Sequence, residues 1–139
     1  MLQIIDLNHV NLVVTDLARA KRFYCDVLGM AERPRPADVE IRGAWLHSQS
    51  AEVHLIVETY ATHAPGDLSF AAPPREGADI ASSRHFSLVI NNTSALVERL
   101  EANGVTIVFG PVTRFGGIVQ TYCYDPDRHL VEFTQLASP

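Results

Sequence analysis

The sequence is short of basic residues, and this shortage excludes one broad class of function. It has 11 Lys and Arg against 16 Asp and Glu, a formal net charge of -5 at pH 7. Nonspecific binding to nucleic acid needs cations clustered on one surface. We therefore expect no nucleic-acid partner.

Long hydrophobic runs are also missing. Every apolar run ends well before the roughly 20 residues that a membrane helix needs, and the first residues, MLQIIDLNH, lack a basic segment followed by the apolar stretch of a signal peptide. We expect a cytoplasmic protein with no membrane partner.

Cysteine is scarce and not closely spaced. The two cysteines, Cys25 and Cys123, form no C-x-x-C pair, so neither a zinc ribbon nor a dithiol redox site is supported. Two free thiols in a reducing compartment are expected, although two such residues can in principle also bridge.

The sequence contains two copies of one module of strands and a helix. Residues 7–14 alternate like a strand, residues 15–30 have helical spacing that ends at Gly29, and three further strands fit residues 30–35, 41–48 and 52–59. The order begins again at His85, with a helix that Gly104 ends and strands near residues 105–109, 118–124 and 130–136. The repeat spacing of about 76 residues indicates a duplication rather than a solenoid.

These patterns predict an α+β fold in which two βαβββ modules form a curved mixed sheet around a cavity. With 139 residues, 47% of them hydrophobic, the chain is long enough for one domain and too short for two ordinary ones. We expect one domain over residues 1–139, made of module 1 (5–59), a linker (60–83) rich in Ala, Pro, Gly and Ser, and module 2 (84–136). His63 falls in that linker.

Overlaying the two modules aligns four side chains that can bind metal. His9 falls on His85, and His54 falls on Glu132. A carboxylate inside an apolar strand is costly to bury unless it is paired or bound to a cation. Neutral imidazoles and one carboxylate suit a single divalent iron, manganese, cobalt, nickel or zinc ion and suit calcium poorly. The linker is long enough for the two modules to bring these four residues together within one chain. We expect this arrangement rather than a site shared between two chains.

The chain resembles the vicinal oxygen chelate superfamily, which includes glyoxalase I, extradiol dioxygenases and the bleomycin resistance proteins. The matching stretches are LNHVNLVVTDLARAKRFYCDVLGM and YDPDRHLVEF. The resemblance implies paired βαβββ modules, a divalent metal held at His9, His54, His85 and Glu132, substrates with vicinal oxygens, and a homodimer. Two positions depart from the family pattern: glyoxalase I usually has Glu or Gln where this chain has His54, and the family's turn glycine is Arg128 here.

We therefore expect a metal-dependent lyase or isomerase of the glyoxalase type, acting on a small molecule through a metal-stabilised enediolate. Glu132 is the expected base and His54 a proton carrier. Four further residues are candidates for contacting substrate: Trp45, His47, Tyr122 and Arg114. His129 lies in a turn, where surface placement is the default.

The sequence leaves two other classes of function open. His9, His85 and Glu132 form a two-histidine, one-carboxylate set, the ligands of an extradiol-type or other iron-dependent dioxygenase. A metal-free protein that binds a drug or metabolite is the second alternative, although a pure binder needs none of the four ligands.

Overall fold

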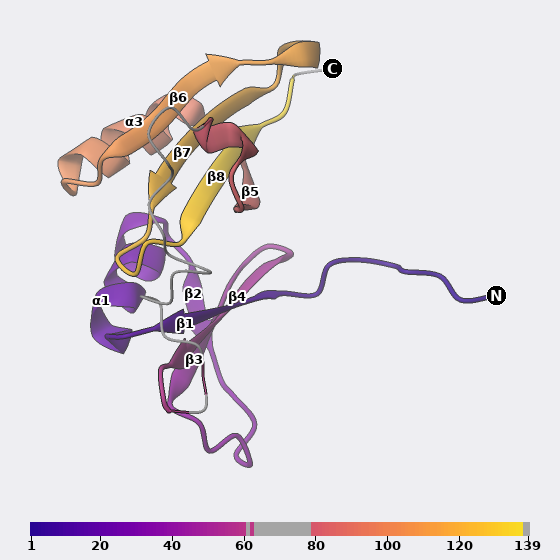
Figure 1. Ribbon diagram of the computed structural model, residues 1–139, viewed down its shortest axis with the longest axis vertical. Coiled ribbons are helices and arrows are strands. Elements are labelled where there is room, and N and C mark those ends of the chain that lie inside the picture. The colour runs from indigo at the N-terminus through magenta and orange to yellow at the C-terminus, as the bar shows by residue number, and fades with distance from the viewer. Residues whose placement is uncertain (61, 63–78, 138–139) are drawn as a thin grey trace.

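The protein folds into two four-stranded sheets, each with a helix on one face (Figure 1). The computed structural model describes residues 1–60, 62 and 79–137; His63 lies outside the described residues. The first sheet has the order β1-β4-β3-β2 and the second the order β5-β8-β7-β6. The strands are β1 (Val10–Val14), β2 (Ala31–Arg33), β3 (Gly43–Ser48), β4 (Ala51–Val57), β5 (Phe86–Ile90), β6 (Ile107–Thr113), β7 (Val119–Tyr124) and β8 (Leu130–Gln135).

Both sheets are mixed in the same way, which confirms the two βαβββ modules. The first strand of each module runs parallel to the last, and the other neighbours are antiparallel. Parallel neighbours need a crossover connection, and in each module the helix provides it. We call β1–β4 with their helix module 1, and β5–β8 with theirs module 2.

Each helix begins after a residue whose side chain caps it, and each ends near the glycine that the sequence indicates. In module 1, α1 (Leu17–Lys21) starts after Asp16, whose side chain accepts a hydrogen bond from the Arg19 amide. It continues as a turn of π-helix, η1 (Arg22–Val27), and the chain leaves through Gly29 at φ +82°. In module 2, α3 (Thr93–Ala102) is capped by Asn92. The sequence did not predict the π-helical turn.

The core lies between each helix and its sheet. In β7 and β8 some residues of the face away from the helix, such as Tyr122 and Glu132, are buried as well. On the face toward each helix, alternate side chains along the strands are fully buried. Examples are Val53 and Leu55 in β4, and Val131 and Phe133 in β8. Burying an aliphatic side chain of this size stabilises the fold by about 1.5–3 kcal/mol. The residues between them, including His54 and Glu132, face the other side of each sheet.

Strand β6 is longer and less regular than the sequence indicates. Its pairing with β7 shifts register on both sides of Phe109. Gly110, just after it, has φ +82°, and a Cβ there would lie 2.3 Å from the carbonyl oxygen of Gln120. Only glycine allows this close approach of the two strands.

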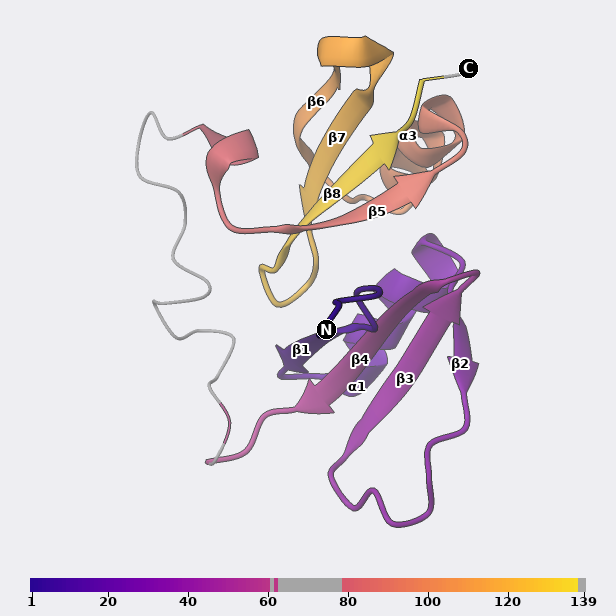
Figure 2. The same cartoon turned by 90° about the vertical axis from the view of Figure 1, so that its right-hand side faces the viewer.

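The two modules meet where the β7–β8 turn of module 2 reaches the helix of module 1 (Figures 1 and 2). The hydroxyl of buried Tyr24 donates to Oδ2 of Asp125 at 2.8 Å. The hydroxyl of Thr15 and the guanidinium of Arg19 both donate to Oδ1 of Asp127. His129 also bonds Asp125 through Nδ1, at 2.8 Å, with a side chain only 13% exposed. The expected surface placement of His129 is therefore wrong, because this turn is a contact between modules.

Other expectations about the chain have clear outcomes. Cys25 and Cys123 are free thiols. Arg128 adopts φ +70°, the left-handed conformation that the missing turn glycine implied. None of the helices in the described part of the chain is long and apolar enough to cross a membrane.

Candidate metal site

The strand registers place the four predicted ligands in corresponding positions of the two modules. Val10 pairs with Val53 in module 1 as Phe86 pairs with Val131 in module 2. His9 and His85 each directly precede these first strands, and His54 and Glu132 each follow one residue after the paired positions. The overlay of the two halves therefore has a structural basis in matching hydrogen-bond ladders.

In module 1, three aromatic rings stack on the open face of the sheet. The ring of His54 lies between those of His9 and Trp45, with centroids 3.9 Å and 4.5 Å away and interplanar angles of 18° and 5°. Trp45 is opposite His54 across β3 and β4. His47, one step along the same face, is opposite Glu52 and is partly buried. Three of the sequence-predicted residues thus form one stack, in which His54 contacts both His9 and Trp45.

A carboxylate that was not predicted from the sequence, that of Glu52, lies at the edge of this stack. Oε1 of Glu52 lies 2.8 Å from Nε2 of His54, and its Oε2 accepts a hydrogen bond of 2.9 Å from Arg33. The hydrogen bond from His54, helped by the charge of Arg33, lowers the pKa of Glu52. Strand alternation was the available signal, because Glu52 is two residues before His54 and shares its face.

In module 2, Glu132 is the centre of a hydrogen-bonded group. Its side chain is 6% exposed, and Oε2 lies 2.9 Å from Nε2 of His85. Oε1 accepts hydrogen bonds from Gln120 at 2.6 Å and Thr134 at 3.0 Å. Neither donor was predicted from the sequence, although Gln120 shares a strand face with Tyr122, and Thr134 shares one with Glu132.

Tyr122 occupies the position in module 2 that Trp45 has in module 1, opposite Glu132 across β7 and β8. Its ring and that of His85 are packed edge to face, with centroids 5.4 Å apart. Burial, together with the charge of Glu132, raises the pKa of Tyr122 to about 12, so the phenol stays protonated at neutral pH. Arg114 lies further out, with its guanidinium 5.4 Å from the centre of the Phe109 ring, which itself packs on Tyr122.

Each of the three histidines predicted as ligands, His9, His54 and His85, has one ring nitrogen within hydrogen-bond distance of an oxygen. Nδ1 of His9 lies 2.7 Å from Oδ1 of Asn8, and Nδ1 of His85 lies 2.7 Å from the carbonyl oxygen of Ser83. A carbonyl oxygen only accepts, so Nδ1 of His85 carries the proton. In the neutral ring, Nε2 of His85 then points its lone pair toward the carboxylate of Glu132, and two acceptors that face each other need a cation or a proton between them. In kind and in pairing, these donors fit a divalent ion.

The structure gathers the four residues as two pairs, not as one cluster. Among the residues that it describes, no three His, Cys, Asp or Glu side chains lie close enough to hold one ion. The expected assembly within one chain is therefore not what this structure has. The modules dock through the helix of module 1 and the β7–β8 turn, and this contact does not bring the two pairs together.

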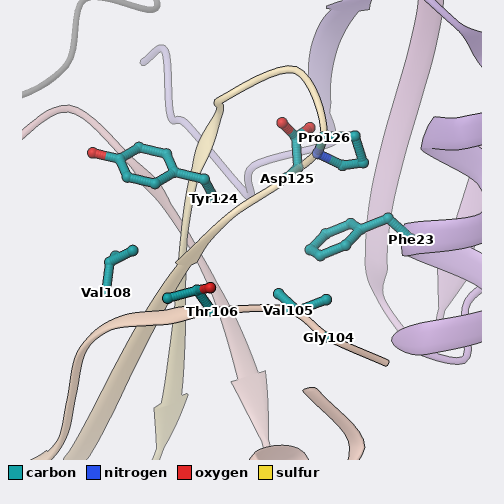
Figure 3. Close-up of a pocket in the computed structure, with 8 residues that line it drawn as sticks. All are labelled: Phe23, Gly104, Val105, Thr106, Val108, Tyr124, Asp125 and Pro126. Carbon is teal, nitrogen blue, oxygen red and sulfur yellow. The ribbon is translucent and has the colours of Figure 1, made fainter. Parts of the chain in front are cut away.

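Two cavities lie elsewhere in the described part of the chain. One, of about 300 Å³, is a seam between the modules where Phe23 faces Val105 and Pro126 (Figure 3). The other, of about 720 Å³, lies between the β3–β4 turn, β5 and α3. His9, His54, His85 and Glu132 line neither of these two cavities, so neither is the expected cavity around the four residues.

The sequence and the fold together assign the class of protein. A family model, Glyoxalase/Bleomycin resistance protein/Dioxygenase superfamily, matches residues 6–133, and the chain belongs to this superfamily. Its members typically bind a divalent metal, act on small molecules and are often dimers, and they include enzymes such as glyoxalase I.

Individual relatives agree with this assignment. The chain is 28% identical over 139 residues to the protein named Glyoxylase I 4 of Arabidopsis thaliana, an alignment that covers 99% of this chain and 74% of the relative. A putative glyoxalase family protein from Bacillus anthracis has the same fold, with a TM-score of 0.75 at 19% identity and 99% of both chains covered. The fosfomycin resistance protein FosX of Listeria monocytogenes, solved with Mn(II) and a dihydroxypropylphosphonic acid, has a TM-score of 0.70 at 17% identity, with 97% of this chain and 95% of that chain covered.

Proposed function

We propose that this protein is a metal-dependent lyase or isomerase of the glyoxalase type, acting on a small substrate with vicinal oxygens. One divalent ion would be held by His9, His54, His85 and Glu132. The observation that carries the proposal is that each of these histidines has one ring nitrogen bound to an oxygen of Asn8, Glu52 or Ser83. Metal-binding histidines almost always have this arrangement, since it sets the tautomer and orients the ring.

The donor set limits the metal and what it would do. Three imidazoles and one carboxylate suit iron, manganese, cobalt, nickel or zinc, and manganese is the ion in the solved Listeria relative. When bound, such an ion polarises a substrate carbonyl as a Lewis acid. With four ligands from the protein, such an ion would also bind two neighbouring substrate oxygens.

The protein's own groups would move the proton. Glu132 is the base, because Gln120 and Thr134 hold Oε1 in place while Oε2 lies 2.9 Å from Nε2 of His85. His54 is the proton carrier in the module 1 position that corresponds to Glu132. Trp45 is opposite His54 and Tyr122 is opposite Glu132, and both rings would line the substrate site. His47 and Arg114 would contact the outer parts of the substrate.

The proposal includes a homodimer that shares each site between two chains. Module 1 of one copy, placed beside module 2 of the other, would join a His9–His54 pair to a His85–Glu132 pair. Supporting this, β1 and β5 are edge strands, and large apolar side chains are exposed in the segment before β1 and on β5: Leu2, Ile4, Ile5, Leu7 and Val89. A monomer rarely leaves so many neighbouring apolar side chains in water.

Metal content and proton exchange test the proposal together. The purified protein should contain a transition metal by elemental analysis, and the metal-loaded protein should exchange the proton next to the carbonyl of small α-hydroxyketones in D2O, seen by NMR. Glu132→Gln should lose exchange by at least about 100-fold, the usual contribution of a general base. Glu101→Gln, an exposed change on α3, is the matched control. Full exchange by Glu132→Gln with metal retained would exclude Glu132 as the base.

A further inference from the structure

The ring of His54 is confined on both faces and along one edge. His9 and Trp45 cover its two faces, and Glu52 takes its Nε2 edge. Its side chain is 12% exposed and that of Glu52 is 18% exposed. Nδ1, the other ring nitrogen, has no hydrogen-bond partner among the described residues.

We propose that Glu52, anchored by Arg33, is the positioning residue of this site, which fixes His54 in the tautomer that carries its proton on Nε2 and keeps a lone pair on Nδ1. This inference rests on the proposed function only for its consequence, which is that Nδ1 is the atom that His54 offers to the ion. The positioning itself depends on contacts within module 1.

The charge of Glu52 dictates the direction of the hydrogen bond. An ionised carboxylate can only accept, so Nε2 of His54 must donate to it. The ion pair with Arg33 makes the ionised form the stable one, since Arg33 reaches Oε2 while His54 bonds Oε1. A neutral imidazole that donates from Nε2 has its lone pair on Nδ1.

The strand registers explain how these three residues meet. Arg33 of β2 is opposite Trp45 of β3, which is opposite His54 of β4. Glu52 lies two residues before His54 on the same face, so its carboxylate reaches both the guanidinium and the ring. Module 1 therefore has its carboxylate one step along the strand from the position that Glu132 has in module 2. A carboxylate at this distance orients the histidine rather than replacing it as a ligand.

The first readout is the tautomer of His54, measured without metal. Long-range 1H–15N NMR of the histidine rings at pH 8 should show His54 as the pure Nε2–H form, with a His54→Gln variant assigning its signals. In Glu52→Ala the ring nitrogens of His54 should move toward values averaged between the two tautomers. Glu52→Gln keeps an oxygen acceptor and should retain the Nε2–H form. Glu32→Gln, which removes a charge paired with Lys21 on the other face of the same sheet, should leave the His54 signals unchanged.

The second readout is metal affinity, measured by titrating Mn²⁺ or Zn²⁺ in a calorimeter. Glu52→Ala should bind about 10–100-fold more weakly than the wild type, the usual cost of removing such a partner. Arg33→Gln should weaken binding in the same direction. Unchanged His54 nitrogens in a folded Glu52→Ala protein would overturn the inference. A shifted tautomer in a protein whose wild type binds no metal would leave the positioning intact and refute the proposed function.

Discussion

The hydroxyl of Tyr24, in the helix of module 1, donates to Oδ2 of Asp125, in the β7–β8 turn of module 2, at 2.8 Å. Tyr24 is fully buried and Asp125 is 4% exposed. Together with the bonds of Thr15 and Arg19 to Asp127, this contact fixes how the modules dock. With the modules docked in this way, the two ligand pairs do not meet within the described part of one chain.

Removing this hydroxyl should loosen the contact between the modules. Tyr24→Phe should lower the free energy of unfolding by about 1–3 kcal/mol, the usual contribution of a buried hydrogen bond to a charged group. Urea unfolding followed by circular dichroism measures it. Tyr60→Phe, at a fully exposed tyrosine, is the matched control and should have no effect. Equal stability of the two variants would show that the Tyr24 hydroxyl does not hold the modules.

A shared site predicts that two inactive variants complement each other. His9→Ala and His85→Ala each remove one ligand, from module 1 and module 2 respectively. Co-expressed, they should form mixed dimers in which one of the two sites has all its ligands, so that about a quarter of the wild-type metal content returns when subunits associate at random. Each variant expressed alone should bind little metal.

Size-exclusion chromatography with light scattering supplies the control for this experiment. Both variants and their mixture should have the mass of a dimer. Mixed dimers that bind no more metal than the separate variants would contradict sharing of the site between chains.

Stability should fall in alkali because two buried acids stay protonated in the fold. Burial raises the pKa of the Cys123 thiol from 9.0 to about 12, and the pKa of Tyr122 from 10.0 to about 12. Since the folded pKa is the higher one, the stabilisation is complete below about pH 9 and is lost as the pH rises toward 12. Each group contributes a slope of up to about 1.4 kcal/mol per pH unit.

Urea unfolding between pH 8 and 11 measures this slope. Cys123→Ala and Tyr122→Phe should each reduce the slope, whereas Tyr60→Phe should leave it unchanged. If the slope survives in both buried-site variants, other groups control the alkaline transition.

The left-handed turn residue offers a stabilising change. Arg128 has φ +70°, a conformation that costs a residue with a Cβ about 1–2 kcal/mol. Arg128→Gly should raise the free energy of unfolding by about 1 kcal/mol, because the strain is relieved. The stabilisation from the contact of the guanidinium with the Tyr124 ring, which this variant loses, reduces the gain. Arg128→Ala separates the two effects, since it loses the ring contact and keeps the strain. A glycine variant no more stable than the alanine variant would contradict the role assigned to strain.

The sequence by itself determined the two modules and the positions of their metal-competent residues. Alternation along β4 and β8 put His54 and Glu132 on the face opposite the core, and Gly29 and Gly104 marked where the helices end. These features depend on residues close together in the chain, so their patterns are legible in the sequence.

Only the tertiary structure decided what those residues contact. The bond from His54 to Glu52, the donors around Glu132, the placement of His129 against Asp125 and the separation of the ligands into two pairs all depend on it. Each requires side-chain directions or the docking of surfaces far apart in the chain. Docking is a small difference between large opposing free energies, which local patterns do not encode.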